Sequence, residues 1–198
     1  MKKQMIKLNR PRCPNPEALR TNYKHRENKD ALIRGSFDKC MYCESKISHI
    51  YYGDIEHIKP KDTFPELEFT WENLGYACAQ CNGYKSNKYN EHDPILNPYS
   101  EIPDNHIVAL GALIAYKGNS TKGKVTIQKS TGVHLNRPSL IEMRQEKINN
   151  IEKVIEICEH LEDGDYKTSA LDELKKETET NKEYSFCIKA LLSIKGLN

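Results

Sequence analysis

Two Cys-x-x-Cys pairs constrain the fold of this chain more than any other feature of its sequence. The first pair is Cys40-Met-Tyr-Cys43 and the second is Cys78-Ala-Gln-Cys81, with 34 residues between them. Four thiolates in two such pairs suit one tetrahedral zinc ion, because each tight turn supplies two adjacent ligands. A structural zinc contributes on the order of 10 kcal/mol to folding. We therefore expect residues 40–88 to form a loop-rich unit that the metal holds together.

The number of cysteines and the character of the N-terminus indicate the cellular compartment. The chain has seven cysteines, an odd number with four in metal-type spacing, which favours a reducing cytoplasm. Cys13 has no partner pair nearby and is predicted to be a buried or spare thiol, whereas Cys158 and Cys187 fall on apolar helix faces as core thiols. No run of about 18 apolar residues is present, so no membrane span is expected. The N-terminus lacks the apolar stretch of a secretory signal.

Charge is distributed unevenly along the 198 residues, although the net charge is only +2. Residues 1–34 hold ten Lys and Arg against three Asp and Glu, and residues 141–198 hold nine against thirteen. A basic front and an acidic rear suit a protein that meets phosphate at one end only. Basic termini are also common as plain solvated surface, so charge alone leaves both interpretations open.

The first hundred residues favour short elements. Three prolines within Arg10–Pro16 exclude regular helix there and predict an ordered arm. A short helix is expected over Asn28–Phe37, and a helix from near Cys81 towards Lys88. Between the cysteine pairs, Gly53-Asp54 is expected to be the turn of a β-hairpin, giving the order strand, turn, strand, loop, helix.

The second half is predicted to hold a hairpin and three helices. Residues 107–116 and 124–128 are expected to be the two hairpin strands. A helix should open at Leu135-Asn-Arg-Pro-Ser and end at Gly164. A second helix is expected to begin at the capping pattern Ser169 to Asp172, and a third at Asn181.

The residues between and beside the cysteine pairs follow a recognisable order. Glu56-His57-Ile-Lys-Pro comes first, then Asn73-Leu, and Cys81 is followed by Asn82-Gly-Tyr-Lys85. This order resembles the HNH endonuclease family with its ββα-metal core. The matching segment covers about a quarter of the chain. Each part is weak alone, but the ordered combination is specific.

The resemblance implies a role for each matching residue. His57 matches the general base, and a neutral imidazole can take a proton from water at cellular pH. Glu56 and Asn82 match the protein ligands of a catalytic Mg²⁺ or Mn²⁺ ion, which prefers such hard oxygen donors. Asn73 matches the residue that fixes the orientation of the base. Lys85, one helical turn beyond Asn82, is expected to neutralise a neighbouring phosphate.

Other residues of the same types are assigned lesser roles. Lys59 and Lys61 flank the loop after His57 and are weaker candidates for phosphate contact. His49, His92 and His134 have no metal-ligand or catalytic motif beside them in the sequence and are expected to be structural. A four-cysteine zinc site alone would indicate an interaction module. In such a module, however, the match of Asn73 and Asn82 to the positions of the nuclease motif would be a coincidence.

A longer resemblance runs from Asp38 to Arg144. The segments that carry it are Trp71-Glu-Asn-Leu, Cys81-Asn-x-x-Lys, Asn97-Pro, Lys124-Val-Thr-Ile and Leu135-Asn-Arg-x-x-Leu-Ile-x-x-Arg144. They resemble, in order, the PtuB-like HNH proteins of Septu and retron anti-phage systems. This resemblance implies a PtuA-like partner, an ATPase of the ABC or SMC type. We expect it on the proline-bearing arm or the acidic C-terminal helices, unless both pack on the chain's own core.

Together these patterns predict an α+β protein. A basic arm and short helix (1–37) would precede a zinc-braced ββα-metal HNH core (38–98), followed by a β-hairpin and C-terminal helices (99–198). The expected function is metal-dependent hydrolysis of nucleic acid, DNA before RNA, in anti-phage defence. The alternative is a catalytically silent, zinc-scaffolded subunit that binds nucleic acid or protein.

Overall fold

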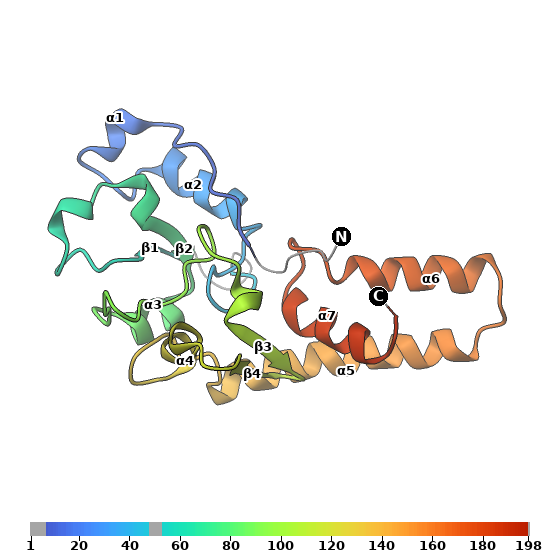
Figure 1. Ribbon diagram of the computed structural model, residues 1–198. Helices are drawn as coiled ribbons and strands as arrows, with labels where there is room; N and C mark the ends of the chain where they lie inside the picture. Colours follow the sequence, from blue (N-terminus) through green and yellow to red (C-terminus); the bar gives the residue numbers. More distant parts are fainter. Residues whose placement is uncertain (1–6, 48–52, 198) are drawn as a thin grey trace.

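The computed structural model describes residues 7–47 and 53–197. Two small antiparallel sheets are joined by short helices, and the C-terminal helices extend away from them (Figure 1). The strands are β1 (Asp54–His57), β2 (Leu74–Ala77), β3 (Ile107–Leu110) and β4 (Leu113–Tyr116). The helices are α1 (Pro16–Leu19), α2 (Arg26–Gly35), α3 (Ala79–Lys85), α4 (Thr121–Ile127), α5 (Pro138–His160), α6 (Asp165–Lys176) and α7 (Ser185–Ile194). Single 3-10 turns occur at Pro65–Leu67, Trp71–Asn73 and Pro103–Asn105.

Strands β1 and β2 and helix α3 form the unit that carries the site. The two strands pair antiparallel, with Asp54 opposite Ala77 and His57 opposite Leu74. Helix α3 follows β2 directly and packs on β1. Two parts of the predicted order were wrong. Asp54, expected in the turn, is the first residue of β1, and the strand β2 after the loop was not predicted. The first strand of the predicted hairpin falls on residues 48–52, which lie outside the described residues.

Gly75 explains why β2 is hard to find in the sequence. Glycine lowers the strand propensity of the Leu-Gly-Tyr-Ala segment. In the fold a Cβ at Gly75 would overlap the Met41 sulfur, so a larger residue at this position would displace the Met41 side chain. The backbone N–H of Met41 donates to Tyr76 O at 2.9 Å and fixes that turn against the strand.

The second sheet also differs from the prediction. β3 and β4 are both drawn from the segment expected to be one strand, with Ile107 opposite Tyr116 and a tight turn at Gly111, whose φ of 61° suits glycine. The predicted second strand, residues 124–128, lies in helix α4 instead. Ser120 caps α4 by accepting a hydrogen bond from the backbone of Gly123 at 3.1 Å. This local cap outweighs the strand propensity of the Val-Thr-Ile segment.

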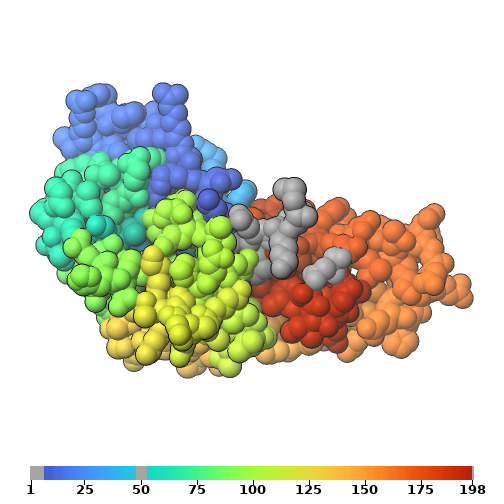
Figure 2. All heavy atoms as spheres, in the orientation of Figure 1, coloured from blue at the N-terminus to red at the C-terminus, as the bar shows by residue number. Residues whose placement is uncertain are grey.

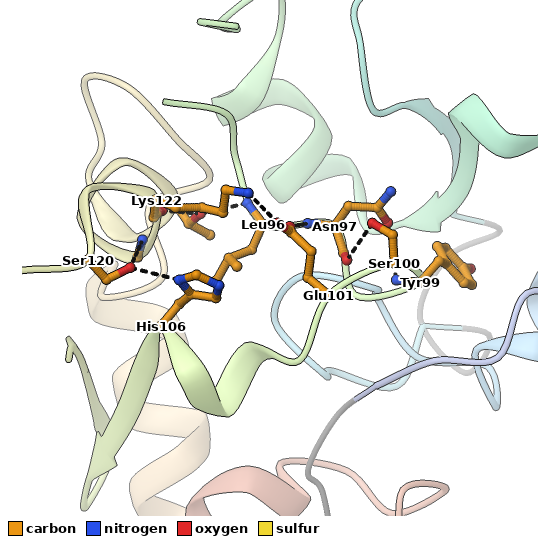
Figure 3. A network of polar contacts seen from close by, with 10 residues as sticks. Leu96, Asn97, Tyr99, Ser100, Glu101, His106, Ser120 and Lys122 are labelled. Carbon is orange, nitrogen blue, oxygen red and sulfur yellow. Dashed lines mark hydrogen bonds and ion pairs between the residues drawn. The ribbon is translucent and has the colours of Figure 1, made fainter. Parts of the chain in front are cut away.

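A polar network joins the loop after α3 to α4 (Figure 3). Glu101 forms an ion pair with Lys122 and accepts the backbone N–H of Asn97 at 2.8 Å. The His106 imidazole and the Ser120 hydroxyl lie 2.8 Å apart, and Thr126 accepts the N–H of Leu96 at 2.9 Å. These contacts hold α4 against the segment 96–106 that leads into β3.

The C-terminal helices match the prediction in number but not at every boundary. α5 begins at Pro138 and buries Ile148, Ile151 and Ile155, as expected from their spacing. Gly164 precedes α6 rather than ending α5, and α6 begins at Asp165, before the predicted cap.

The described helices include none with the length and apolar character needed to cross a membrane. Cys158 and Cys187 are buried free thiols, as predicted.

The N-terminal arm packs on the chain's own core rather than standing free. Leu8 is buried, and the Arg10 guanidinium donates to the carbonyl oxygens of Trp71 and Leu74 at 2.8 and 2.6 Å. The Trp71 indole donates to Pro11 O at 2.8 Å. In the space-filling view the blue N-terminal segment lies against the teal segment that contains β1 and β2 (Figure 2). The segment from Leu8 to Pro11 is thus held by contacts with the chain's own core.

Candidate active site and metal centre

The four cysteines converge at one point between the Cys40–Cys43 turn and the start of α3. Their sulfur atoms all lie within 4.8 Å of one another, so they could hold a metal ion. Cys78 is the N-cap of α3, and its sulfur accepts the N–H of Cys81 at 3.4 Å. Cys40, Cys43 and Cys81 are buried, and Cys78 is partly exposed. The predicted grouping of the four thiols is confirmed.

Arg137 is a further residue at this centre, and the sequence analysis assigned it no role. Its guanidinium nitrogens lie 3.4 Å from the Cys81 sulfur, 3.8 Å from Cys43 and 3.9 Å from Cys78. The side chain is only 5% exposed and also donates to the Gln80 amide at 2.7 Å. A buried cation beside thiolates offsets their charge. The only signal was its place in Leu-Asn-Arg-Pro-Ser, immediately before α5.

A pocket of about 260 Å³ opens beside this centre, where β1 faces α3. The residues that line it come from both elements and from two neighbouring loops. They are Tyr23, Lys24, Asp54, Ile55, Glu56, His57, Pro60, Lys61, Asp62, Asn82, Lys85, Ser86 and Asn87. The structure therefore brings His57, Glu56, Asn82 and Lys85 to one pocket, and Asn73 packs behind it.

His57 is held in one orientation at the end of β1. Its Nε2 lies 3.0 Å from the backbone oxygen of Glu68, which can only accept, so Nε2 carries the proton and Nδ1 is left as an acceptor. The Tyr23 ring packs edge-on against the imidazole at 4.6 Å. Burial lowers the pKa of His57 below its usual 6.5, outweighing the opposite effect of the Glu68 carbonyl. Burial thus favours the neutral imidazole.

Asn73 fixes the backbone that follows His57. Its side-chain oxygen accepts the N–H of Lys59 at 2.8 Å, and its NH₂ group donates to Lys59 O at 2.9 Å and to Leu67 O at 3.2 Å. The Asn73 backbone oxygen also accepts the N–H of Ile58 at 2.9 Å. The side chain contacts the chain two residues beyond the imidazole, not the imidazole itself. Any influence on the base is therefore through the backbone.

Glu56 and Lys85 form a buried ion pair. Lys85 Nζ lies 2.5 Å from Glu56 Oε1, with side-chain exposures of 1% and 3%. The same ammonium donates to His57 O at 2.7 Å, and the Tyr42 hydroxyl donates to Glu56 at 3.3 Å. Burial raises the pKa of Glu56, and Lys85 counteracts part of that rise. Lys85 therefore differs from the expectation of a phosphate contact, because it is enclosed and engaged with β1.

Asn82 faces a carboxylate that the sequence analysis did not select. Its NH₂ group donates to Asp54 Oδ2 at 3.0 Å. Asp54 and Glu56 are two residues apart on β1 and so lie on the same face of the strand. The i, i+2 spacing from Glu56 was the available signal for Asp54, but Asp54 was assigned to the predicted Gly53-Asp54 turn.

Of the remaining candidates, Lys61 lines the pocket and Lys59 does not. Lys61 pairs with Glu68 at 2.9 Å, and Lys59 pairs loosely with Glu91 at 3.4 Å. His92 and His134 do not line the pocket, and His134 packs edge-on against the Tyr84 ring at 4.9 Å. His49 lies outside the described residues.

Comparison with known proteins agrees with this geometry. Residues 40–88 match the family model of the HNH endonucleases. The chain is 34% identical over 176 residues to the Septu protein PtuB of Bacillus thuringiensis, covering 79% of this chain and 66% of that protein. It is 27% identical over 204 residues to the Septu protein PtuB of Bacillus mycoides (strain KBAB4), covering 87% and 67%. The chain thus spans about two thirds of the length of these relatives.

Proposed function

The chain carries an HNH endonuclease domain at residues 40–88 and is a homologue of the Septu PtuB proteins, and from this premise we propose that it is a metal-dependent nuclease of an anti-phage defence system. Its substrate is nucleic acid, with DNA preferred to RNA. The observation that carries the proposal is His57, whose Nδ1 is left as an acceptor on the wall of a pocket shared with Asn82.

The four-cysteine centre would hold a structural zinc ion. A tetrahedron with Zn–S bonds of about 2.3 Å has S–S edges of about 3.8 Å, and Cys43 and Cys78 place their sulfur atoms 3.9 Å apart. An all-thiolate donor set with a buried arginine beside it fits zinc well. Elemental analysis should find about one zinc per chain, and Cys78→Ser should lose both the zinc and the fold. A stable, active protein free of zinc would contradict this assignment.

His57 would act as the general base. Nδ1 accepts a proton from a water molecule, while the Nε2–H remains on the Glu68 oxygen and prevents the ring from turning. Lys85 holds the carbonyl of His57, and Asn73 holds the next peptide, so the strand end that carries the ring is fixed on both sides. Oriented bases of this kind typically contribute about 10² to 10⁴ in rate.

The pocket also offers oxygen ligands for a divalent cation. Asn82 and a β1 carboxylate, Glu56 in the family resemblance, are hard donors that suit Mg²⁺ or Mn²⁺. When bound, such an ion would stabilise negative charge on the phosphate and on the leaving oxygen. Lys24 at the pocket lining adds positive charge on the side where the chain's basic front lies.

Nicking of supercoiled plasmid tests the function directly. The zinc-loaded protein should convert supercoiled to open-circular DNA with Mg²⁺ or Mn²⁺ and should be inactive in EDTA concentrations that leave its zinc in place. A parallel reaction with single-stranded and double-stranded RNA would establish the substrate class. Failure to cut any of these substrates, alone and with the partner described next, would refute the proposed activity.

We also propose that the chain works with a PtuA-like ATPase of the ABC or SMC type. Its homology to Septu PtuB proteins supports this, as do the exposed apolar side chains on the C-terminal helices, such as Ile157, Tyr166 and Ile194. The arm is a weaker candidate for the contact because it is already packed on the core. Co-expression with a PtuA-like ATPase should give one peak in size-exclusion chromatography. Two separate peaks, with full-rate cleavage by this chain alone, would overturn the proposal.

A further inference from the structure

Two carboxylates on β1 compete for the role of anionic metal ligand, and their surroundings differ sharply. Glu56 is almost sealed, and its Oε1 is already in contact with the Lys85 ammonium and the Tyr42 hydroxyl. A divalent cation bound to this carboxylate would lie beside the buried ammonium, where weak screening makes the repulsion large. Release of Lys85 would also remove its hydrogen bond to His57 O. Glu56 therefore fits the part of a buried counter-charge better than that of a metal ligand.

Asp54 has the opposite surroundings. It is only partly buried, lines the pocket, and its Oδ2 lies 3.0 Å from the Asn82 amide. In the described part of the chain, none of the ion pairs includes Asp54. An aspartate beside an asparagine amide combines a charged and a neutral oxygen donor, a set that Mg²⁺ and Mn²⁺ prefer.

We propose that Asp54, rather than Glu56, is the anionic ligand of the catalytic cation, which it shares with Asn82. This inference rests on the proposed nuclease function and names the metal-binding pair within the same pocket. The Asn82 amide now offers its NH₂ group to Asp54, and rotation about the terminal side-chain bond exchanges the nitrogen for the oxygen. Glu56 is then a positioning residue that acts through Lys85 on the strand end carrying His57.

Direct titration with Mn²⁺ separates the two carboxylates without reference to activity. The full-length, zinc-loaded protein is titrated with Mn²⁺, and free Mn²⁺ is measured by electron paramagnetic resonance for wild type, Asp54→Asn and Glu56→Gln. Asp54→Asn keeps the size of the side chain and one acceptor oxygen but removes the charge. We expect it to weaken Mn²⁺ binding at least about tenfold, and Glu56→Gln to change binding by less than about threefold.

A double variant covers the case in which Glu56→Gln does not fold. If Glu56→Gln fails to fold because Lys85 loses its counter-charge, the double variant Glu56→Gln/Lys85→Met removes both buried charges and serves in its place. The inference would be overturned if Asp54→Asn bound Mn²⁺ with wild-type affinity, or if only the Glu56 variant lost affinity about tenfold. Either result would leave the proposed metal-dependent nuclease activity unaffected. A wild-type protein that neither binds Mn²⁺ nor cuts nucleic acid would overturn both.

Discussion

The orientation of the His57 ring is the residue-scale feature on which the proposed chemistry depends. The Glu68 oxygen selects the tautomer and the Tyr23 ring restricts the tilt of the imidazole. Replacing His57 with alanine removes the base but not these supports. We expect His57→Ala to lower the plasmid-nicking rate by about 10² to 10⁴ while zinc content and circular dichroism stay unchanged. His92→Ala, at an exposed histidine outside the pocket, is the matched control and should cut normally.

The pH dependence follows from the same ring. Burial lowers the pKa of His57 below its usual 6.5, so protonation, which disables the base, occurs only in more acidic solution. The nicking rate should therefore fall as the pH drops through a midpoint below 6.5 and should be level from pH 7 to 8. Rates measured at saturating cation, with His57→Ala as the reference that lacks this acidic limb, check the assignment. An acidic limb centred above 6.5 would speak against His57 as the buried base.

At the scale of single elements, the sequence predicts what depends on spacing and misses what depends on packing. The cysteine pairs, the helix before them and the helix opened by Pro138 are found because ligand spacing, periodicity and caps are local signals. β2 is missed because Gly75 serves a contact with Met41 that no local pattern reveals. Likewise, the enclosure of Lys85 and the contact of Arg137 with three cysteines arise only when distant segments meet.

The contact between the start of α5 and the cysteine centre leads to an element-scale prediction. Arg137 lies against three thiolate-forming sulfur atoms, and outer-shell partners typically contribute about 10- to 100-fold to metal affinity. We expect Arg137→Met to weaken zinc binding by about that factor, measured by competition with a chromogenic chelator. The control is Arg26→Met, at an exposed side chain on α2. Equal zinc affinity in the Arg137 variant and the wild type would show that the guanidinium does not support the metal.

At the scale of the whole molecule, a buried polar cluster connects the Cys40–Cys43 turn to the C-terminal helices. Lys39 Nζ lies 3.0 Å from Glu44 Oε1, with side-chain exposures of 2% and 5%. Glu44 also accepts the Ser185 hydroxyl at 2.9 Å and the N–H of Phe186 at 3.1 Å, both at the start of α7. Lys39 donates to Lys182 O at 2.9 Å. The division at residues 98 and 99 stays a prediction, but these contacts link the two sides of it.

Glu44→Gln tests whether this cluster makes the chain unfold as one unit. The substitution leaves the Lys39 ammonium buried without a counter-charge, and breaking one side of a buried pair typically costs about 3 to 5 kcal/mol. Guanidinium unfolding of the zinc-loaded proteins, followed by both circular dichroism and Trp71 fluorescence, should show one transition in the wild type. The variant should unfold earlier, with the helical signal lost before the tryptophan signal. Asp163→Asn, which removes one partner of an exposed ion pair on the same helical part, should leave the curve unchanged. Two separate transitions in the wild type would mean that the C-terminal helices fold independently of the nuclease core, and that Lys39 and Glu44 do not couple them.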